Sequence, residues 1–186
     1  MINHIGATEI ETNRLMLRRF STEDAIDMFH NWTHDSEVTK YLTWLNHENI
    51  ETTYKILKIW KDNYKNIDYY HWAIELKESK QVVGSISLIN LDDYNENCEI
   101  GYCIGKEFWN KGITTEALSN IINFAFTQIG FKRITGKHHI RNLASGRVMK
   151  KCGLKYEGVL RKIIKDGNGV LVDCKCYSIL NDEYLN

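Results

Sequence analysis

The 186-residue sequence predicts a mixed α/β fold in which helices flank a central, mainly antiparallel, twisted sheet of about seven strands. Helical patterns dominate residues 21–64, and three consecutive segments between Tyr69 and Ile104 then alternate apolar with more polar side chains, as the strands of a meander do. Strand-like and helix-like patterns alternate after them. Because the sequence has no internal repeat, low-complexity tract or linker-like segment, we expect a single domain over residues 1–186.

The N-terminal third contributes one strand and three helices. Arg14 to Phe20 alternates enough to form the first strand. Ser21 and Asp24 stand at capping-box spacing, which predicts a helix that continues to about residue 32. Two further helices are predicted over Asp35–Leu42 and Asn46–Tyr64. The second of these has one apolar face, formed by Ile50, Tyr54, Leu57 and Trp60.

Turn-forming residues bound the remaining predicted elements. Turns at Lys77–Lys80 and Asn95–Asn97 separate the three meander strands, and Asp166–Gly169 carries both Asp-Gly and Asn-Gly, a strong hairpin signal. The predicted ranges are strands Tyr69–Leu76, Val82–Leu91 and Cys98–Ile104, helix Ile113–Ile129, strand Arg133–His139, helix Leu143–Lys151, and strands Leu154–Lys165 and Val170–Leu180.

Composition excludes several classes of protein. No apolar run approaches the roughly 20 residues of a membrane helix, and Met1–Glu11 lacks the pattern of a secretion signal. Five cysteines without CxxC spacing indicate reduced thiols in a cytoplasmic protein, and the seven histidines show no ligand spacing, so we expect no metal site. Net charge is zero, which argues against nucleic-acid binding, although residues from Phe131 onward hold 12 Lys/Arg against 5 Asp/Glu. That charge imbalance is either a property of the solvated surface without functional meaning or a basic side of the protein that holds an anionic cofactor.

The segment from Glu99 to Ala117 carries the clearest chemical signal. A predicted strand ends at Ile104, a loop follows, and a helix begins near Ile113 directly after Gly112. Unpaired N–H groups and the positive end of the helix dipole make such a start an anion site, and a glycine lets a phosphate approach the backbone closely. A glycine before a helix is equally compatible with a simple turn.

Two motifs resemble one family. The run EIGYCIGKEFWNKGITTEAL, from Glu99, is similar to the coenzyme A loop of the GNAT acetyltransferases, in the subgroup of ribosomal-protein and other Rim-type N-acetyltransferases. The run RNLASGRVMKKCGL, from Arg141, resembles the asparagine-serine helix of that subgroup, and ETNRLMLRRFSTEDA and SEVTKYLTW resemble its N-terminal strand and helices. The resemblance covers nearly the whole chain and implies acetyl-coenzyme A as acetyl donor and a primary amine as acceptor.

The resemblance also implies roles for individual residues. Main-chain groups of Tyr102, Cys103 and Ile104 would meet the pantetheine arm, the Ile104 N–H facing the thioester oxygen, while Asn142 and Ser145 would lie near the pantetheine and sulfur. Arg147 and Lys151 are among the cations along the cofactor path. The pyrophosphate loop would comprise Trp109, Asn110, Lys111, Gly112, Ile113, Thr114 and Thr115.

The catalytic groups depart from the commonest family pattern. Many members carry a tyrosine four residues after the serine as general acid, and this chain has Met149 there, which leaves Ser145 or a water held by it. Glu99 is the candidate base, or else a surface or cross-strand glutamate. Aromatic side chains that either wall the acceptor cleft or fill the core are Trp32, Tyr41, Trp44, Trp72 and Tyr177.

Three functions stay open on the sequence. The first is acetylation of a protein N-terminal amine, and the second is acetylation of a small amine such as a polyamine, an amino acid or an aminoglycoside. The third is a non-catalytic coenzyme A-binding module. We expect a monomer or a homodimer, with no nucleic-acid or membrane partner.

Overall fold

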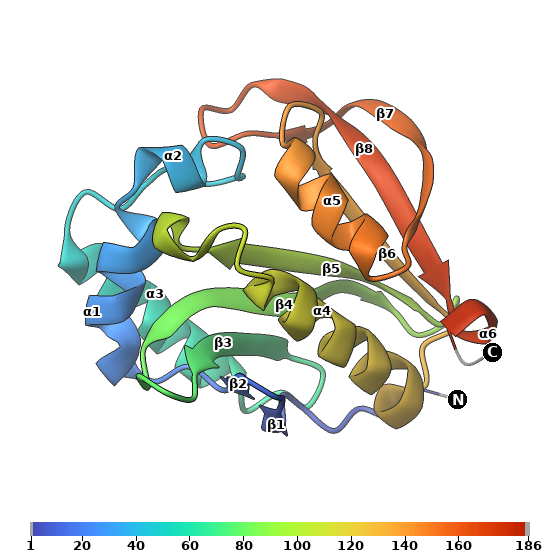
Figure 1. The fold of residues 1–186 in the computed structure, drawn as a ribbon, viewed down its shortest axis with the longest axis horizontal. Helices are drawn as coiled ribbons and strands as arrows, with labels where there is room; N and C mark the ends of the chain where they lie inside the picture. Colours follow the sequence, from blue (N-terminus) through green and yellow to red (C-terminus); the bar gives the residue numbers. More distant parts are fainter. Residues whose placement is uncertain (1, 185–186) are drawn as a thin grey trace.

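The computed structural model describes residues 2–184 and has one eight-stranded sheet at its centre (Figure 1). The strands lie in the order β1-β2-β3-β4-β5-β6-β8-β7, and every neighbouring pair is antiparallel except β5 and β6. The mainly antiparallel mixed fold is therefore confirmed. The strands are β1 (Ile10–Glu11), β2 (Leu15–Arg18), β3 (Tyr70–Leu76), β4 (Val82–Asp92), β5 (Asn97–Ile104), β6 (Arg133–His139), β7 (Lys155–Lys165) and β8 (Leu171–Leu180).

The strand that sequence reasoning missed is β1, which pairs only Ile10 and Glu11 with β2. Two residues are too few to show a period. Each of the five predicted helical segments is present, and the short C-terminal helix α6 was not predicted. The long helix begins later than predicted, because Asn49 caps it by accepting a hydrogen bond from Thr52 N–H. The α-helices are α1 (Ala25–Met28), α2 (Ser36–Thr39), α3 (Ile50–Asn63), α4 (Ile113–Phe124), α5 (Leu143–Lys151) and α6 (Asn181–Tyr184).

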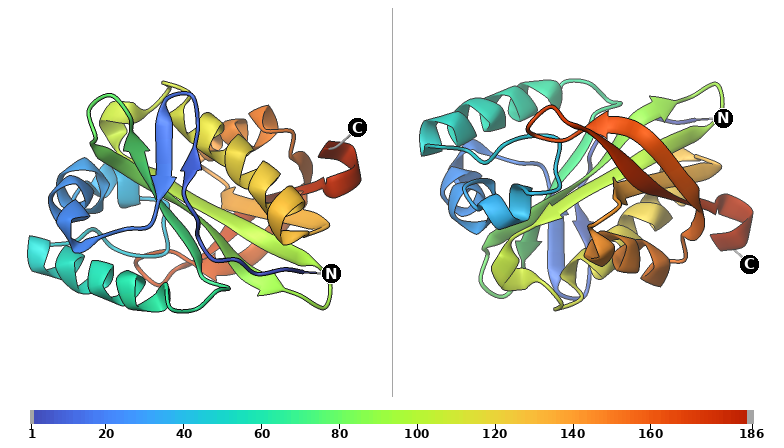
Figure 2. Two further views of the ribbon diagram at one scale, coloured as in Figure 1. Left: turned by 90° about the horizontal axis from the view of Figure 1, so that it is seen from below. Right: turned by 90° about the horizontal axis from the view of Figure 1, so that it is seen from above.

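Helices cover both faces of the sheet and bury two apolar clusters. Helices α4 and α5 lie on one face, and α1 and α3 lie on the other (Figure 2). The larger cluster lies beneath α4 and α5 and includes Leu118, Ile121 and Ile100. The smaller cluster lies between the sheet and α1 and α3, and includes Phe20 and Leu57. Burial of these apolar faces holds the helices against the two faces of the sheet.

Strands β5 and β6 pair only over their first halves. Their parallel register runs from Asn97 opposite Arg133 to Ile100 opposite Gly136. Beyond that point β5 stays paired with β4 as far as Ile104, and β6 stays paired with β8 as far as His139. The two strands therefore diverge beyond Ile100 and Gly136 (Figure 1).

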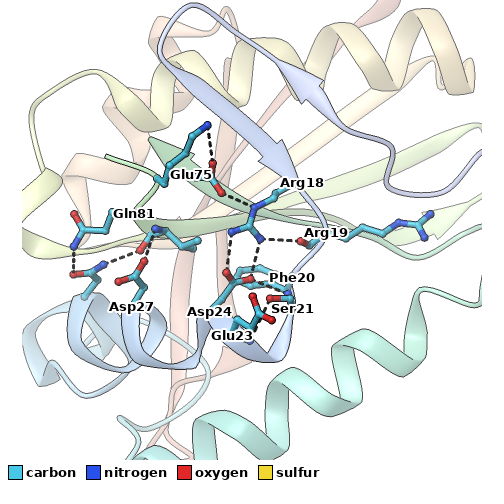
Figure 3. A network of polar contacts seen from close by, with 12 residues as sticks. Arg18, Arg19, Phe20, Ser21, Glu23, Asp24, Asp27, Glu75 and Gln81 are labelled. Carbon is cyan, nitrogen blue, oxygen red and sulfur yellow. Dashed lines mark hydrogen bonds and ion pairs between the residues drawn. The ribbon is translucent and has the colours of Figure 1, made fainter. Parts of the chain in front are cut away.

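An arginine network holds the helical segment before α2 in place. The Arg18 guanidinium donates to Asp24 Oδ1 and Oδ2 at 2.8 and 2.9 Å and to Glu75 Oε2 at 2.6 Å (Figure 3). Asp24 also accepts from Ser21 N–H, so the predicted capping box is present. The side chains of Asp24 and Glu75 are only 7% and 10% exposed, so Arg18 supplies the charge that both need.

Arg18→Met should therefore lower the free energy of unfolding by about 3 kcal/mol, because it leaves the buried Asp24 carboxylate without a cation and Glu75 with only Lys80, at 3.7 Å. Urea denaturation measures this loss. Arg133→Met is the matched control, since the Arg133–Glu157 side chains are 35% and 42% exposed and such pairs contribute less than about 1 kcal/mol. Equal losses in the two variants would contradict the role given to Arg18.

Candidate active site at the divergence of β5 and β6

A cavity of about 710 Å³ follows the opening between β5 and β6. Its walls come from the end of β5, the loop before α4, the first turns of α4 and α5, and the α2 segment at residues 37–42. All of the residues predicted to bind a cofactor line this cavity except Lys111. The structure thus brings together Tyr102, Cys103, Ile104, Trp109, Asn110, Gly112, Ile113, Thr114, Thr115, Asn142, Ser145, Arg147 and Lys151.

The N-terminus of α4 presents unpaired amides to the cavity. Gly112 is the N-cap residue with φ +75°, a left-handed conformation that glycine adopts without strain. The first hydrogen bond of the helix runs from Glu116 N–H to Gly112 O, at 3.0 Å. Within residues 2–184, no protein atom accepts a hydrogen bond from the amides of Ile113, Thr114 or Thr115. Unpaired N–H groups at a helix N-terminus, together with the positive end of the helix dipole, favour a bound anion.

Arg14 supports this loop, a role that sequence reasoning did not assign. Its guanidinium donates to Lys111 O at 3.0 Å and to Glu116 Oε2 at 2.7 Å. Burial raises the pKa of Glu116, but hydrogen bonds from Thr12 and Arg14 outweigh it and lower that pKa overall. Arg14 thus neutralises a carboxylate in the first turn of α4 that would otherwise repel an anion. No local sequence signal links residues about 100 positions apart.

Trp109 joins the loop to the end of β5. Its indole N–H donates to Ile104 O at 3.0 Å. Gly105 N–H donates in the opposite direction, to Val83 O of β4, at 2.9 Å. Because successive residues of a strand direct their main-chain groups to alternate sides, the N–H groups of Tyr102 and Ile104 face the opening rather than β4.

The first turn of α5 meets β5 across the cavity. Asn142 caps the helix by accepting a hydrogen bond from Ser145 N–H at 3.3 Å. The Tyr102 hydroxyl donates to Ser145 O at 2.8 Å and lies 3.0 Å from Ser145 Oγ. Burial raises the pKa of Tyr102. Met149 is 1% exposed and belongs to the larger apolar cluster, so no phenol comes from that position.

Glu99 lies outside the cavity. Both of its carboxylate oxygens lie 2.5 Å from Lys137 Nζ, and Asn90 Nδ2 donates to Oε2 at 3.2 Å. Alternation along β5 places this side chain on the sheet face opposite Tyr102. The cross-strand ion pair that the sequence left as an alternative is therefore present.

The aromatic residues predicted to wall the acceptor cleft lie in different parts of the structure. Tyr41 lines the cavity, at 4.9 Å between ring centroids from His139. Trp32 and Trp72 are 1% and 0% exposed and lie in the two apolar clusters, so their prediction as acceptor contacts is wrong. Trp44 packs against the smaller cluster. Tyr177 lines a second cavity of about 220 Å³ beside α5, where it stacks on His138.

The described residues also bear on two other kinds of site, a metal site and a membrane span. Within residues 2–184, no group of three or more His, Cys, Asp or Glu side chains is arranged to hold a metal ion. None of the helices in the described part of the chain has the length and apolar character that a bilayer span requires.

Known proteins resemble both the sequence and the fold. A family model described as "Acetyltransferase (GNAT) domain" matches residues 14–155. YoaA of Bacillus subtilis (strain 168), named an uncharacterized N-acetyltransferase, is 33% identical over 92% of this chain and 96% of its own. YdaF of the same organism, named a putative ribosomal N-acetyltransferase, is 33% identical over 78% of this chain and 79% of its own. An acetyltransferase (GNAT family) from Bacillus anthracis matches with TM-score 0.81 and 27% identity, over 94% of this chain and 99% of that one.

Proposed function

The chain belongs to the GNAT acetyltransferase family and is an acetyl-coenzyme A-dependent N-acetyltransferase; we propose that its acceptor is the α-amine of a polypeptide, which attacks the thioester directly in a ternary complex. The observation that carries the cofactor assignment is the set of free amides at Ile113, Thr114 and Thr115, at the mouth of the cavity. Two likenesses support a polypeptide α-amine as the acetyl acceptor. One is the resemblance to the Rim-type subgroup, and the other is the similarity to YdaF, whose name refers to the ribosome.

The residues of the cavity fit coenzyme A. The amides of α4 suit a diphosphate, and Arg141, Arg147 and Lys151 on the same cavity wall suit further phosphate charge. A cavity of about 710 Å³ is of the size that encloses an extended cofactor. The unpaired N–H groups of Tyr102 and Ile104 suit the amides of a pantetheine arm, which would extend β5 as an added strand. The Ile104 N–H is then the donor for the thioester oxygen as negative charge develops there.

An α-amine suits the position of Glu99. The Glu99 carboxylate already accepts hydrogen bonds from Lys137 and Asn90, so it has few lone pairs left to take a proton. An amine substrate of which a fraction is already deprotonated in solution is therefore favoured. An α-amine with a pKa near 8 is roughly 10% neutral at pH 7, whereas a lysine amine with a pKa near 10.4 is roughly 0.04% neutral. We assign Glu99 as the base that takes the remaining proton, and Ser145 as the hydroxyl that faces the leaving sulfur.

Gly112→Glu should weaken coenzyme A binding by at least roughly 100-fold, or about 2.7 kcal/mol, because it places a carboxylate where the diphosphate must lie. Isothermal titration calorimetry measures the affinity. Gly169→Glu is the matched control, since Gly169 has a similar φ of +78° with open space around it. Unchanged affinity in Gly112→Glu would refute the loop assignment.

The acceptor proposal predicts a clear order of rates. A peptide with a free α-amine and no lysine should release coenzyme A thiol faster than the same peptide blocked at its N-terminus and carrying one lysine. Spermidine and an aminoglycoside complete the panel. Faster thiol release with spermidine or the aminoglycoside than with the peptide would show that the acceptor is a small amine. No release with any of these amines would favour the non-catalytic coenzyme A-binding module.

Glu99→Gln should lower kcat/KM for the free-amine peptide by roughly 100-fold at pH 7, with a steeper rise of rate toward high pH, because only the neutral amine then reacts. Lys137→Gln is the control, since it breaks the same ion pair but keeps the carboxylate. Equal losses in the two variants would assign Glu99 a structural role only.

A further inference from the structure

We propose that Tyr102 is a positioning residue for the leaving-group step, its hydroxyl polarising the Ser145 hydroxyl that faces the sulfur. This inference rests on the proposed function, because it requires Ser145 to face the thioester. It assigns a task to the Tyr102 side chain, whereas the resemblance gave a role only to its main chain.

The first support is the position of the phenol. Tyr102 belongs to β5 and Ser145 to the first turn of α5, 43 positions away, and both line the same cavity. The phenol thus spans from the diverging strand to the helix, beside the path assigned to the pantetheine arm. A hydroxyl from β5 therefore reaches the helix that carries Met149 in place of a phenol.

The second support is that one proton has two acceptors within reach. The Tyr102 hydroxyl lies 2.8 Å from Ser145 O and 3.0 Å from Ser145 Oγ, so rotation about its C–O bond moves the proton from one to the other. While the phenol donates to Ser145 O, the serine hydroxyl can direct its own proton toward the cavity by rotation about its C–O bond alone.

The chemical consequence appears as the carbon–sulfur bond breaks. The serine proton then points to the developing thiolate, and the phenol proton turns to Ser145 Oγ, giving the chain Oη–H···Oγ–H···S⁻. No proton leaves either hydroxyl, so the step needs no further acid to balance it. A serine hydroxyl that accepts one hydrogen bond donates a stronger one, and donation to an ionised acceptor is stronger again.

The burial of Tyr102 supports the neutral form of this hydrogen-bonded pair of hydroxyls. Burial raises the pKa of Tyr102, which favours the hydroxyl form that these hydrogen bonds require. Its competing role is a simple brace between β5 and α5. A brace would affect the binding of coenzyme A or the stability of the fold, whereas polarisation of Ser145 affects the rate of thiolate release.

The test is a double-mutant cycle with Tyr102→Phe, Ser145→Ala and the double variant. Thiol release at saturating acetyl-coenzyme A gives kcat, and calorimetry with coenzyme A gives Kd. We expect Tyr102→Phe to lower kcat about 10-fold with Kd changed less than about twofold, and the double variant to be no slower than Ser145→Ala alone. Tyr69→Phe is the control, since its hydroxyl bonds to His71 Nδ1 away from the cavity and its loss should leave kcat unchanged.

Each other outcome overturns a distinct claim. Full kcat in Tyr102→Phe beside a slow Ser145→Ala overturns this inference alone. Additive losses show that Tyr102 acts independently of Ser145, and a weaker Kd with intact kcat shows a brace. Full kcat in Ser145→Ala overturns both the inference and the leaving-group role assigned to that serine, while acetyl transfer by the enzyme stands.

Discussion

The early end of the β5–β6 pairing is the constraint on which the rest of the structure depends. Main-chain N–H groups away from water need partners, and the groups of Tyr102 and Ile104 lose a neighbouring strand where β6 turns away. Gly136 stands at this point, where a Cβ would lie 2.9 Å from the Ile100 side chain, so any larger residue would force a shift of that side chain. An opening with a free strand edge and a helix N-terminus at its mouth suits a long, anionic, amide-bearing ligand.

Under the proposed mechanism, alternation along β5 divides the catalytic groups between two faces of the sheet. Tyr102 lies on the side of α5 and contacts Ser145, whereas Glu99 lies on the other side and contacts Lys137. A proton taken from an amine and a charge developing on sulfur would thus be handled on opposite sides of one strand.

The sequence predicted those features that local patterns determine. The meander, the capping box at Ser21 and the glycine before α4 each depend on residues within a few positions of one another. Arg14 and the Tyr102 side chain were missed because their partners are set by sheet order and helix placement. Trp32 and Trp72 were misassigned because a large aromatic side chain looks the same in sequence whether it fills a core or walls a cleft.

The most direct test of the central claim follows the amides themselves. Titration of ¹⁵N-labelled protein with coenzyme A should shift the N–H resonances of Ile104, Ile113, Thr114 and Thr115 strongly downfield and slow their exchange with water, since those groups gain acceptors. The amide of Gly105, already bonded to Val83 O, serves as the internal reference. Binding of coenzyme A without any change at the α4 amides would contradict the account.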